Sequence, residues 1–569
     1  MTAGISVLFE NLDKAAVNSI MGRMRPRYFS EGEYVCAQGE AGDALYLIDR
    51  GLVEVQVARG KTRHVITRLR HGDVFGEMAL LTDEPRAASI ETIVPTLVFE
   101  LDRSGFAEVC SRYPRFLMNL TRMLINRQNQ STSRLLRAEQ ADVVGIAVGT
   151  GKEPLADRVI NAARAVTPRQ VSVVDTTGQL TTSKTPVPDV SLGTVIPIID
   201  QLRTTHDVVI VVARSDCEGL ATLMRCVDRP FLVGDETDIY RSADALRSLH
   251  RIETAQIGGT GSAPLDAPAN FEVIARLGDG ADDPVVSWLG RHITRTKIGL
   301  ALGAGGAKGF AHLGVVSVLR RAGFTIDYIT GSSIGALVGS MLASGYDLEE
   351  TDARLRVIWQ DEHVDQLPQI TPDGISAGML KVLDAVFDAV GDRRISELGT
   401  PLGVMTADLE QGQPVPILDG PLFEALRAAL SIPGLMPPYK RNGHRLVDAV
   451  CLTPVPTACA RSMGADVVIA INLLHRQSAG VGPGEPPQRR TARRQQNMDP
   501  VIETLMMLQT DTSIRNAANA DVVINPRFTP SSWRDFHLSD LFREAGREAA
   551  EGSLAELRTL VRPAAASAG

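Results

Sequence analysis

The chain has 569 residues, of which 44% are hydrophobic and 22% charged, and its formal net charge is −8. This composition is that of an ordinary globular protein of three or four domains, and the negative balance gives no overall attraction to nucleic acid or to an anionic membrane. The first residues lack the pattern of a leader peptide, and no run of eighteen apolar residues is present. We therefore expect a cytoplasmic protein that reaches lipid, if at all, from the inner face of a membrane.

The cysteines also favour a cytoplasmic protein. Their spacing shows no disulfide ladder and no metal-binding pattern, and we expect reduced thiols. They are Cys36, Cys110, Cys217, Cys226, Cys451 and Cys459.

Residues 30–101 follow a short helical lead-in and contain short strands of alternating polarity, separated by glycines. Many short strands with regular turns predict a small barrel or jelly roll. The strand candidates are 34–37, 44–48, 53–57, 63–66 and 88–90.

A ligand site is predicted inside this β domain, from Gly76, Glu77 and Arg86. Glycine allows close approach of a backbone, a carboxylate accepts from ribose hydroxyls, and arginine pairs with phosphate. The segments 75–81 and 85–89 resemble the phosphate-binding cassette of cyclic nucleotide-binding domains. The resemblance implies a cyclic nucleotide as an allosteric ligand, and Ala87, which has no hydroxyl, favours cAMP over cGMP. The alternative is a barrel that kept its shape and lost its ligand.

Residues 113–140 predict one long linker helix, and residues 141–290 alternate strands and helices as a parallel α/β domain does. The turn Gly149-Thr150-Gly151-Lys152 hints at a phosphate-binding loop. However, Ile146 stands where the first glycine belongs and Glu153 replaces Ser/Thr, so we interpret the domain as a degenerate linker.

The stretch 297–309 is an apolar strand that runs into glycines and then into a helix, which places free backbone N–H groups at a helix N-terminus. Such a loop binds an anion. The dinucleotide fingerprint fails because its third glycine is replaced by Lys308, and the order of residues does not fit a P-loop. A transient oxyanion is the remaining candidate.

The segment Gly331-Ser332-Ser333-Ile334-Gly335 fits that candidate, since Gly-x-Ser-x-Gly is the nucleophile elbow between a strand and a helix. By itself the motif is as compatible with an ordinary turn of small residues. Two glycine elbows in successive strand–turn–helix units are much less expected by chance.

Residues 297–550 resemble the patatin-like phospholipases, specifically the bacterial relatives of neuropathy target esterase. The matching segments are 305–315, 331–335, 406–409, 431–434 and 463–466. The resemblance implies a serine lipid acyl hydrolase with a Ser333–Asp448 dyad, no required cofactor, and a phospholipid or lysophospholipid substrate. It also implies an oxyanion hole formed by the loop residues Gly305, Gly306, Ala307, Lys308 and Gly309.

One departure from the family is Asp448-Ala449-Val450, where the family has Asp-Gly-Gly or Asp-Gly-Ala. If that position needs a positive φ, Ala449 strains the loop. The alternative function is therefore a cyclic nucleotide-binding signalling protein with an impaired hydrolase.

The predicted domains are 1–140, a cyclic nucleotide-binding domain with its linker helix; 141–290, the degenerate α/β linker; and 291–569, the hydrolase. A Gly- and Pro-rich insertion at 477–500 carries two arginine pairs, 489–490 and 493–494. It predicts a solvated loop or, alternatively, a contact with anionic lipid. The sequence gives no indication of the oligomeric state.

Overall fold

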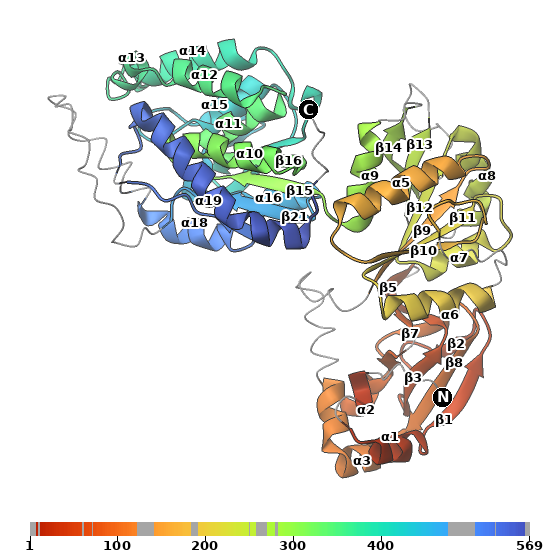
Figure 1. Cartoon of the computed structure of the whole chain (residues 1–569). Coiled ribbons are helices and arrows are strands. Elements are labelled where there is room, and N and C mark those ends of the chain that lie inside the picture. The colour runs from red at the N-terminus through yellow and green to blue at the C-terminus, as the bar shows by residue number, and fades with distance from the viewer. Residues whose placement is uncertain are drawn as a thin grey trace. The chain divides into compact units, whose positions relative to one another are not determined.

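The computed structural model describes residues 7–9, 12–59, 62–70, 72–82, 84–121, 141–183, 192–247, 249, 251–257, 270–278, 283–475, 504, 507–529 and 531–563. The chain forms two compact units. The first comprises residues up to 161 together with 169–286, and the second comprises 162–168 and the residues from 287 onward. Figure 1 labels the elements of both.

The first unit begins with the predicted β domain, which consists of two antiparallel four-stranded sheets in the orders β1-β8-β3-β6 and β2-β7-β4-β5. Tyr46, Ile48, Val53, Phe75 and Val98 form the apolar core of the domain. The strands are β1 (Arg25–Phe29), β2 (Tyr34–Cys36), β3 (Ala44–Arg50), β4 (Leu52–Arg59), β5 (Thr62–Arg70), β6 (Val74–Phe75), β7 (Ser89–Thr92) and β8 (Thr96–Asp102).

Short helices flank this β domain. They are η1 (Val7–Phe9), α1 (Lys14–Met21), α2 (Glu77–Thr82) and α3 (Arg103–Arg112). The predicted linker helix is helical over residues 114–121, and the remainder of that prediction, 122–140, lies outside the described residues.

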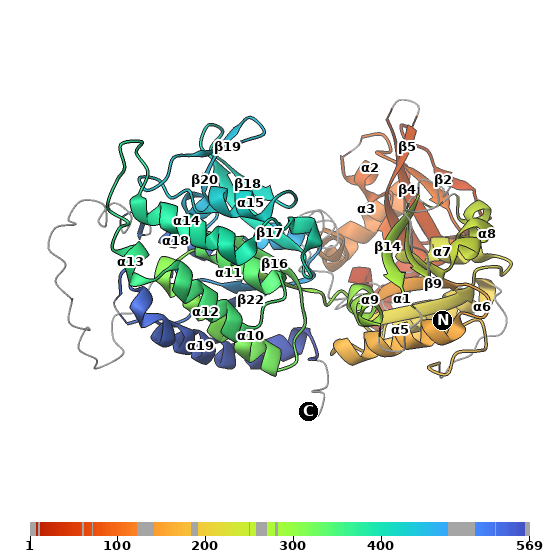
Figure 2. The ribbon, with the colours of Figure 1, turned by 90° about the horizontal axis from the view of Figure 1, so that it is seen from above.

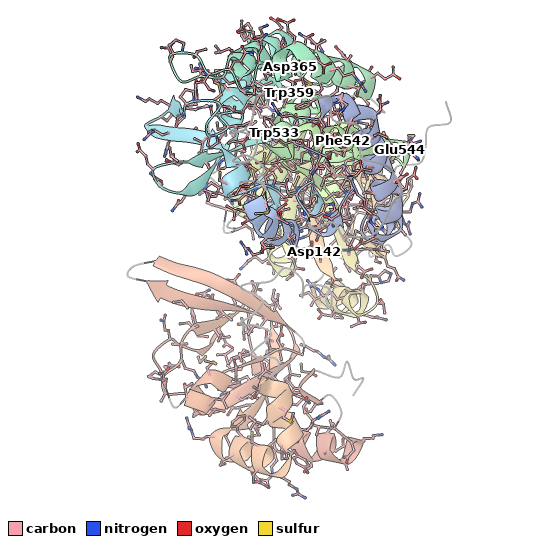
Figure 3. All side chains as sticks on the ribbon, turned by 90° about the vertical axis from the view of Figure 1, so that its left-hand side faces the viewer. Asp142, Trp359, Asp365, Trp533, Phe542 and Glu544 are labelled. Carbon is pink, nitrogen blue, oxygen red and sulfur yellow. The ribbon has the colours of Figure 1, made fainter. Side chains whose placement is uncertain are left out.

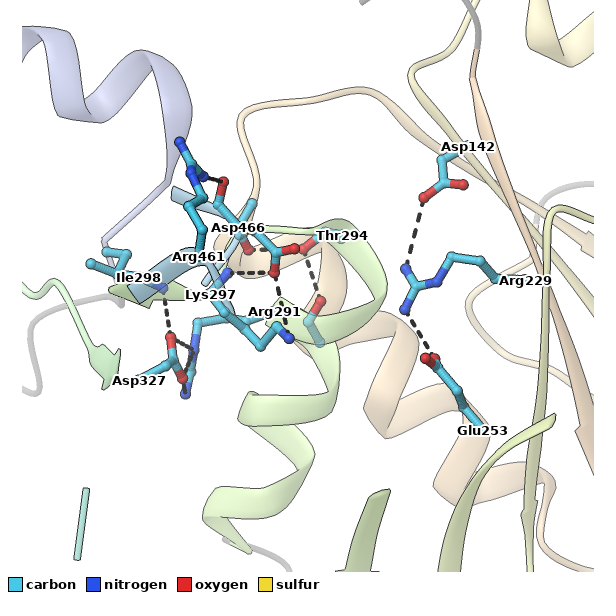
Figure 4. Close-up of polar contacts among 12 residues, drawn as sticks. Asp142, Arg229, Glu253, Arg291, Thr294, Lys297, Ile298, Asp327, Arg461 and Asp466 are labelled. Carbon is cyan, nitrogen blue, oxygen red and sulfur yellow. Dashed lines mark hydrogen bonds and ion pairs between the residues drawn. The ribbon is translucent and has the colours of Figure 1, made fainter. Parts of the chain in front are cut away.

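The α/β domain of the first unit has six parallel strands in the order β10-β11-β9-β12-β13-β14. The strands are β9 (Asp142–Val148), β10 (Val171–Asp175), β11 (Val208–Arg214), β12 (Arg229–Gly234), β13 (Ile252–Ile257) and β14 (Phe271–Leu277). The helices are α5 (Glu153–Val166), α6 (Leu192–Arg203), α7 (Leu220–Cys226), α8 (Glu236–Leu246) and α9 (Pro284–Thr294), the last of which runs on into the second unit. Arg229 ties the strands together through ion pairs of 3.7 Å to Asp142 and 3.1 Å to Glu253 (Figure 4).

Carboxylates occupy the glycine turn that follows β9. The side chain of Asp238, which is buried, fills the space where a Cβ on Gly149 would stand. Lys152 pairs with Asp235 at 3.4 Å, and Glu153 is buried at the position of the missing Ser/Thr. A phosphate would meet negative charge here, which supports the interpretation of this turn as one that binds no phosphate.

The second unit is built on a mixed sheet in the order β19-β20-β17-β16-β15-β21-β22, with β18 added beside β17. The strands are β15 (Ile298–Leu302), β16 (Ile326–Ser332), β17 (Leu402–Asp408), β18 (Gln413–Ile417), β19 (Tyr439–Arg441), β20 (His444–Asp448), β21 (Val467–Ile471) and β22 (Val522–Ile524). Parallel pairing joins β17, β16, β15, β21 and β22, and the remaining pairs are antiparallel.

Helices cover both faces of this sheet, and β15 shows why its two faces differ. Ile298, Leu300 and Leu302 point into the large core formed with the helices of one face. Gly299 and Ala301 alternate with them and meet the small residues around α16 on the other face. Because successive side chains of a strand point to opposite faces, β15 has one face of large residues and one face of small residues. Both faces are covered, so all five residues of the strand are buried.

The helices and short 3₁₀ turns of the second unit are η3 (Gly306–Phe310), α10 (Ala311–Arg321), α11 (Ile334–Ala343), α12 (Leu348–Ile358), α13 (Asp361–Val364), α14 (Ala377–Val390), η4 (Ile395–Glu397), α15 (Leu422–Ala429), η5 (Ala449–Cys451), α16 (Thr457–Ser462), α18 (Thr510–Ala517), η6 (Phe536–Leu538) and α19 (Ser539–Leu560). In Figure 2, α10 and α19 lie along the same side of the sheet. Glycines let these two helices touch, because a Cβ on Gly314 would overlap the backbone of Arg543 and one on Gly546 would overlap the backbone of Ala311.

A buried ion pair anchors the start of the sheet (Figure 4). Arg291 of α9 donates to both oxygens of Asp327 at 2.8–3.1 Å, and Asp327 also accepts from the Ile298 N–H at 2.9 Å. The Asp327 side chain is 1% exposed. β15 and β16 are therefore held in register at the ends opposite to their glycine turns.

Among the described residues, no helix combines the length and the apolar character that crossing a membrane requires. The six cysteines are all free thiols.

Candidate active site

The nucleophile elbow predicted at Ser333 is present in the structure. Ser333 stands between β16 and α11 with φ 54° and ψ −125°, a strained conformation for a residue with a side chain. The glycines on both sides are sterically required: a Cβ on Gly331 would overlap the Gly335 backbone, and one on Gly335 would overlap Leu302. The local sequence thus forces a sharp turn that presents the serine hydroxyl at the end of a central strand.

Asp448 is the partner of Ser333. The Ser333 hydroxyl donates to Oδ2 of Asp448 at 2.6 Å, and Oδ1 of the same carboxylate accepts from the Val450 N–H at 2.9 Å. Burial raises the pKa of Asp448 from 3.8 to about 6, although both hydrogen bonds act in the opposite direction. The raised pKa gives the carboxylate enough basicity to accept a proton near neutral pH.

Ala449 does not strain the loop. Arg295, Ser333 and Asn442 are the residues other than glycine with positive φ in the described part of the chain, so Ala449 has an ordinary backbone. Ala449 begins η5, and its methyl group packs in a small cluster with Met405 and Cys459. The strain expected if this position needed a positive φ is absent, and the departure from Asp-Gly leaves the Asp448 carboxylate in contact with Ser333.

The glycine loop lies beside the dyad, and hydrogen bonds to neighbouring segments hold it in place. The Gly303 N–H donates to the Ile471 carbonyl at 3.1 Å, and Nε2 of His312 contacts the Gly303 carbonyl at 2.9 Å. Burial lowers the pKa of His312 to about 4, so its ring is neutral and Nε2–H is the donor. His312 therefore positions the loop and is no general base.

Of the five predicted oxyanion-hole residues, the structure leaves two with backbone donors that have no acceptor among the described residues, Gly305 and Gly306. The Ala307 N–H donates to the Trp533 carbonyl at 2.7 Å, so the prediction that Ala307 contributes is corrected: its donor is already used. Lys308 and Gly309 lie further along η3. The Lys308 ammonium stands 5.5 Å from the Phe528 ring centroid, and Gly309 packs against Ile334.

An apolar pocket of about 20 Å³, room for roughly one water molecule, opens onto the dyad. Its lining residues come from several elements: Gly306, Ser333, Ile334, Trp359, Leu430, Ile432, Asp448, Val450, Trp533 and Phe536.

The aromatic residues of this wall were not predicted. Trp359 follows α12, while Trp533 and Phe536 precede α19, far away in the sequence. The chain has three tryptophans, and two of them line this pocket. That scarcity is a weak signal, and no motif connected it with Ser333.

In the first unit, the predicted nucleotide-binding residues lie together at the end of β6 and the start of α2. Arg86, whose side chain is 4% exposed, donates to the Gly76 carbonyl at 2.9 Å and to the Ala44 carbonyl at 3.0 Å. Its Nε is buried without a hydrogen-bond partner among the described residues. Glu77 is buried next to Gly76, and Ala87 is exposed. Two N–H groups of the arginine thus hold it at the cassette, and its Nε–H has no acceptor there.

Comparison with known proteins identifies the two domains. Residues 300–460 match the patatin-like phospholipase family, and residues 26–113 match the cyclic nucleotide-binding domain. The chain thus carries a patatin-like phospholipase domain behind an N-terminal cyclic nucleotide-binding domain, and the resemblance inferred from the motifs is confirmed.

Comparison with whole protein sequences finds relatives that are named NTE family proteins. An uncharacterized NTE family protein of Mycobacterium tuberculosis is 38% identical over 191 residues, which is 33% of this chain and 52% of that protein, so this match spans about half the relative's length. A second NTE family protein of the same organism is 24% identical over 582 residues, 98% of this chain and 96% of the relative. The Homo sapiens patatin-like phospholipase domain-containing protein 6 is 24% identical over 78% of this chain and 37% of its own length. The alignment with the second of these NTE family proteins thus spans nearly the whole of both chains.

Proposed function

We propose that the chain is a serine hydrolase that cleaves an acyl ester of a phospholipid or lysophospholipid with the Ser333–Asp448 dyad. The observation that carries the proposal is the 2.6 Å hydrogen bond from the Ser333 hydroxyl to a buried carboxylate with a pKa of about 6. The matched patatin-like phospholipase domain supports the class of reaction. In the proposal, access to substrate is from the surface of a membrane.

The first half of the reaction follows from the positions of the two side chains. The Ser333 oxygen attacks the ester carbonyl while its proton passes to Oδ2 of Asp448. The tetrahedral intermediate then collapses, the alkoxide leaving group takes the proton from Asp448, and Ser333 carries the acyl group. In the second half a water molecule gives its proton to Asp448 and attacks the acyl-enzyme. The bond between the acyl carbon and the Ser333 oxygen then breaks, that oxygen takes the proton back from Asp448, and the fatty acid leaves.

In the proposal, backbone N–H groups of the glycine loop stabilise the negative charge that develops on the ester carbonyl oxygen. Gly306 lines the same pocket as Ser333, and Gly305 directly precedes Gly306 in the loop. A donor to a transition-state oxyanion typically lowers the barrier by about 2.7–4 kcal/mol. Fixation of the loop by His312 and Ile471 means that the donors are oriented before substrate arrives.

The test is hydrolysis of a p-nitrophenyl acyl ester and of a lysophospholipid by the full chain and by Ser333→Ala and Asp448→Asn. Both variants should lose turnover, and a fluorophosphonate should acylate Ser333 in the unaltered protein, as seen by mass spectrometry. Ser340→Ala is the matched control, because Ser340 is a buried serine of α11 that bonds only to a helix carbonyl, Leu337. Turnover in Ser333→Ala would refute the dyad, and absence of turnover in the unaltered chain would leave the signalling alternative.

The first unit supports a second role, the binding of a cyclic nucleotide. In this proposal Arg86 pairs with the phosphate through N–H groups that the Gly76 and Ala44 carbonyls leave free, Nε–H among them, and Glu77 accepts from the ribose hydroxyl. Because Ala87 offers no hydroxyl to a guanine, we propose a preference for cAMP. Calorimetry with the full chain tests this preference directly against cGMP.

A further inference from the structure

Two tryptophans that line the active-site pocket carry indole N–H groups with no hydrogen-bond acceptor among the described residues. Trp359 is 5% exposed and Trp533 is 4% exposed, and in the described part of the chain neither Nε1 atom has a partner. Both residues line the pocket that also contains Ser333. Figure 3 labels the two residues within the second unit.

Packing restrains the Trp359 ring, and a main-chain hydrogen bond holds Trp533 beside the glycine loop. The Trp359 ring stacks on Phe536 with a centroid distance of 4.5 Å and an interplanar angle of 4°. The main chain of Trp533 is tied to the glycine loop, since its carbonyl accepts the Ala307 N–H at 2.7 Å. A buried donor that stays unpaired is costly, so its persistence beside a reaction centre points to an acceptor supplied by the ligand.

Among the described residues, no atom of the pocket wall accepts from either indole. The side chains of Ile334, Leu430, Ile432 and Val450 are hydrocarbon, and the Ser333 hydroxyl is directed at Asp448. A plain alkyl chain entering this pocket would push its walls apart and still leave both indole donors unpaired. An oxygen on the entering molecule would satisfy them.

We infer that Trp359 and Trp533 bind a second, uncharged oxygen of the substrate, distinct from the carbonyl oxygen of the ester that is cleaved. The inference deepens the proposed function and rests on it. A phosphate oxygen is excluded by the apolar wall, because a charge placed there would lose its hydration without a counter-ion. The oxygen is a hydroxyl on the acyl chain near its carboxyl end, or the free glycerol hydroxyl of a lysophospholipid.

Two matched substrate pairs separate these sources. The first pair is p-nitrophenyl 3-hydroxydecanoate and p-nitrophenyl decanoate, which differ only by the acyl hydroxyl. The second is 1-decanoyl lysophosphatidylcholine and its 2-deoxy analogue, which differ only by the glycerol hydroxyl. We expect the full chain to hydrolyse one oxygenated member with a kcat/KM about three- to tenfold above that of its partner, as one net hydrogen bond provides.

Trp359→Phe and Trp533→Phe keep an aromatic ring in the wall and remove the N–H. Each should lower the ratio between the oxygenated and plain substrates, whatever it does to both rates together. Trp288→Phe is the matched control. Trp288 is the remaining tryptophan of the chain, stacks on His292 and is not among the residues that line the pocket. Ratios near one in both pairs for the full chain, or ratios that neither tryptophan variant changes, would overturn the inference.

Binding separates failure of this inference from failure of the proposed function. Calorimetry with the Ser333→Ala variant measures the affinity for each member of the two pairs without turnover. A tighter affinity for an oxygenated member that is lost in Ser333→Ala/Trp359→Phe supports the inference even if the chain hydrolyses none of the four. Equal affinities within both pairs, alongside Ser333-dependent hydrolysis, would overturn the inference and leave the proposed function standing.

Discussion

At the scale of single residues, the pKa of Asp448 governs the chemistry. The carboxylate must be ionised to take the proton of Ser333, and burial raises its pKa to about 6. A raised pKa means that the protonated, inactive form extends to higher pH than it would for an exposed aspartate.

We therefore predict an acid limb in the pH profile. The kcat/KM for a p-nitrophenyl ester should be level above about pH 7 and fall tenfold per pH unit below an apparent pKa of about 6. His312 does not contribute to this limb, since its pKa is lowered to about 4. A limb centred near pH 4 would show that Asp448 is not desolvated in the working enzyme.

The glycine loop gives a second prediction at this scale. Gly306 has φ +58°, and a Cβ there would approach the Trp533 carbonyl oxygen to 2.5 Å. Gly306→Ala should thus displace an oxyanion donor and lower kcat by about 10²–10³-fold with a much smaller change in KM.

The control for this substitution is Gly345→Ala. Gly345 also has a positive φ, +87°, but nothing lies within 4 Å of its added Cβ. It therefore reports the cost of backbone strain without an effect on the pocket. A change confined to KM in Gly306→Ala would make the loop a site of ground-state binding instead.

At the scale of elements, the buried Arg291–Asp327 pair fastens α9 to β15 and β16 (Figure 4). Removal of one partner from such a pair leaves an uncompensated buried charge. Asp327→Ala should lower the free energy of unfolding of the second unit by about 3–5 kcal/mol.

Asp540→Ala is the matched comparison, because Asp540 pairs with Arg356 at 2.7 Å but is 71% exposed. That change should cost less than about 1 kcal/mol. Calorimetric unfolding of the full-length variants compares the two. Equal, small losses would mean that the β15–β16 register does not depend on the buried pair.

At the scale of the whole molecule, one chain joins a cyclic nucleotide-binding domain to a patatin-like phospholipase domain. A ligand of the first can change the activity of the second only if it binds two arrangements of the chain with different affinity. A coupling free energy of about 1–3 kcal/mol would change hydrolysis some 5- to 150-fold.

We predict that cAMP binds the full chain more tightly than cGMP and changes the rate of ester hydrolysis. Arg86→Ala should abolish both effects, because the phosphate would be buried without its partner. Arg27→Ala is the control, since Arg27 is a half-exposed arginine of the same β domain paired with Glu100. If neither nucleotide binds at millimolar concentration in calorimetry, the β domain is structural and control of Ser333 lies with lipid or a protein partner.

The sequence by itself determined the features that depend on neighbours along the chain. Glycines around Ser333, the apolar run before the glycine loop and the cassette at Gly76 specify local turns, and the structure has those turns at these positions. The multidomain fold class is likewise confirmed. The assignment of Ser333 and Asp448 as a catalytic pair remains a prediction until activity is measured.

Only the tertiary structure decided what depends on packing between distant segments. It showed that Oδ2 of Asp448 lies 2.6 Å from the hydroxyl oxygen of Ser333, with no backbone strain at Ala449. It showed too that the Trp533 carbonyl accepts a hydrogen bond from the Ala307 N–H. It also placed Trp359 and Trp533 in one pocket wall. The physical reason is that a turn is set by the φ and ψ preferences of a few adjacent residues, whereas a pKa, an occupied donor or a pocket wall is set by whichever segments the fold brings together.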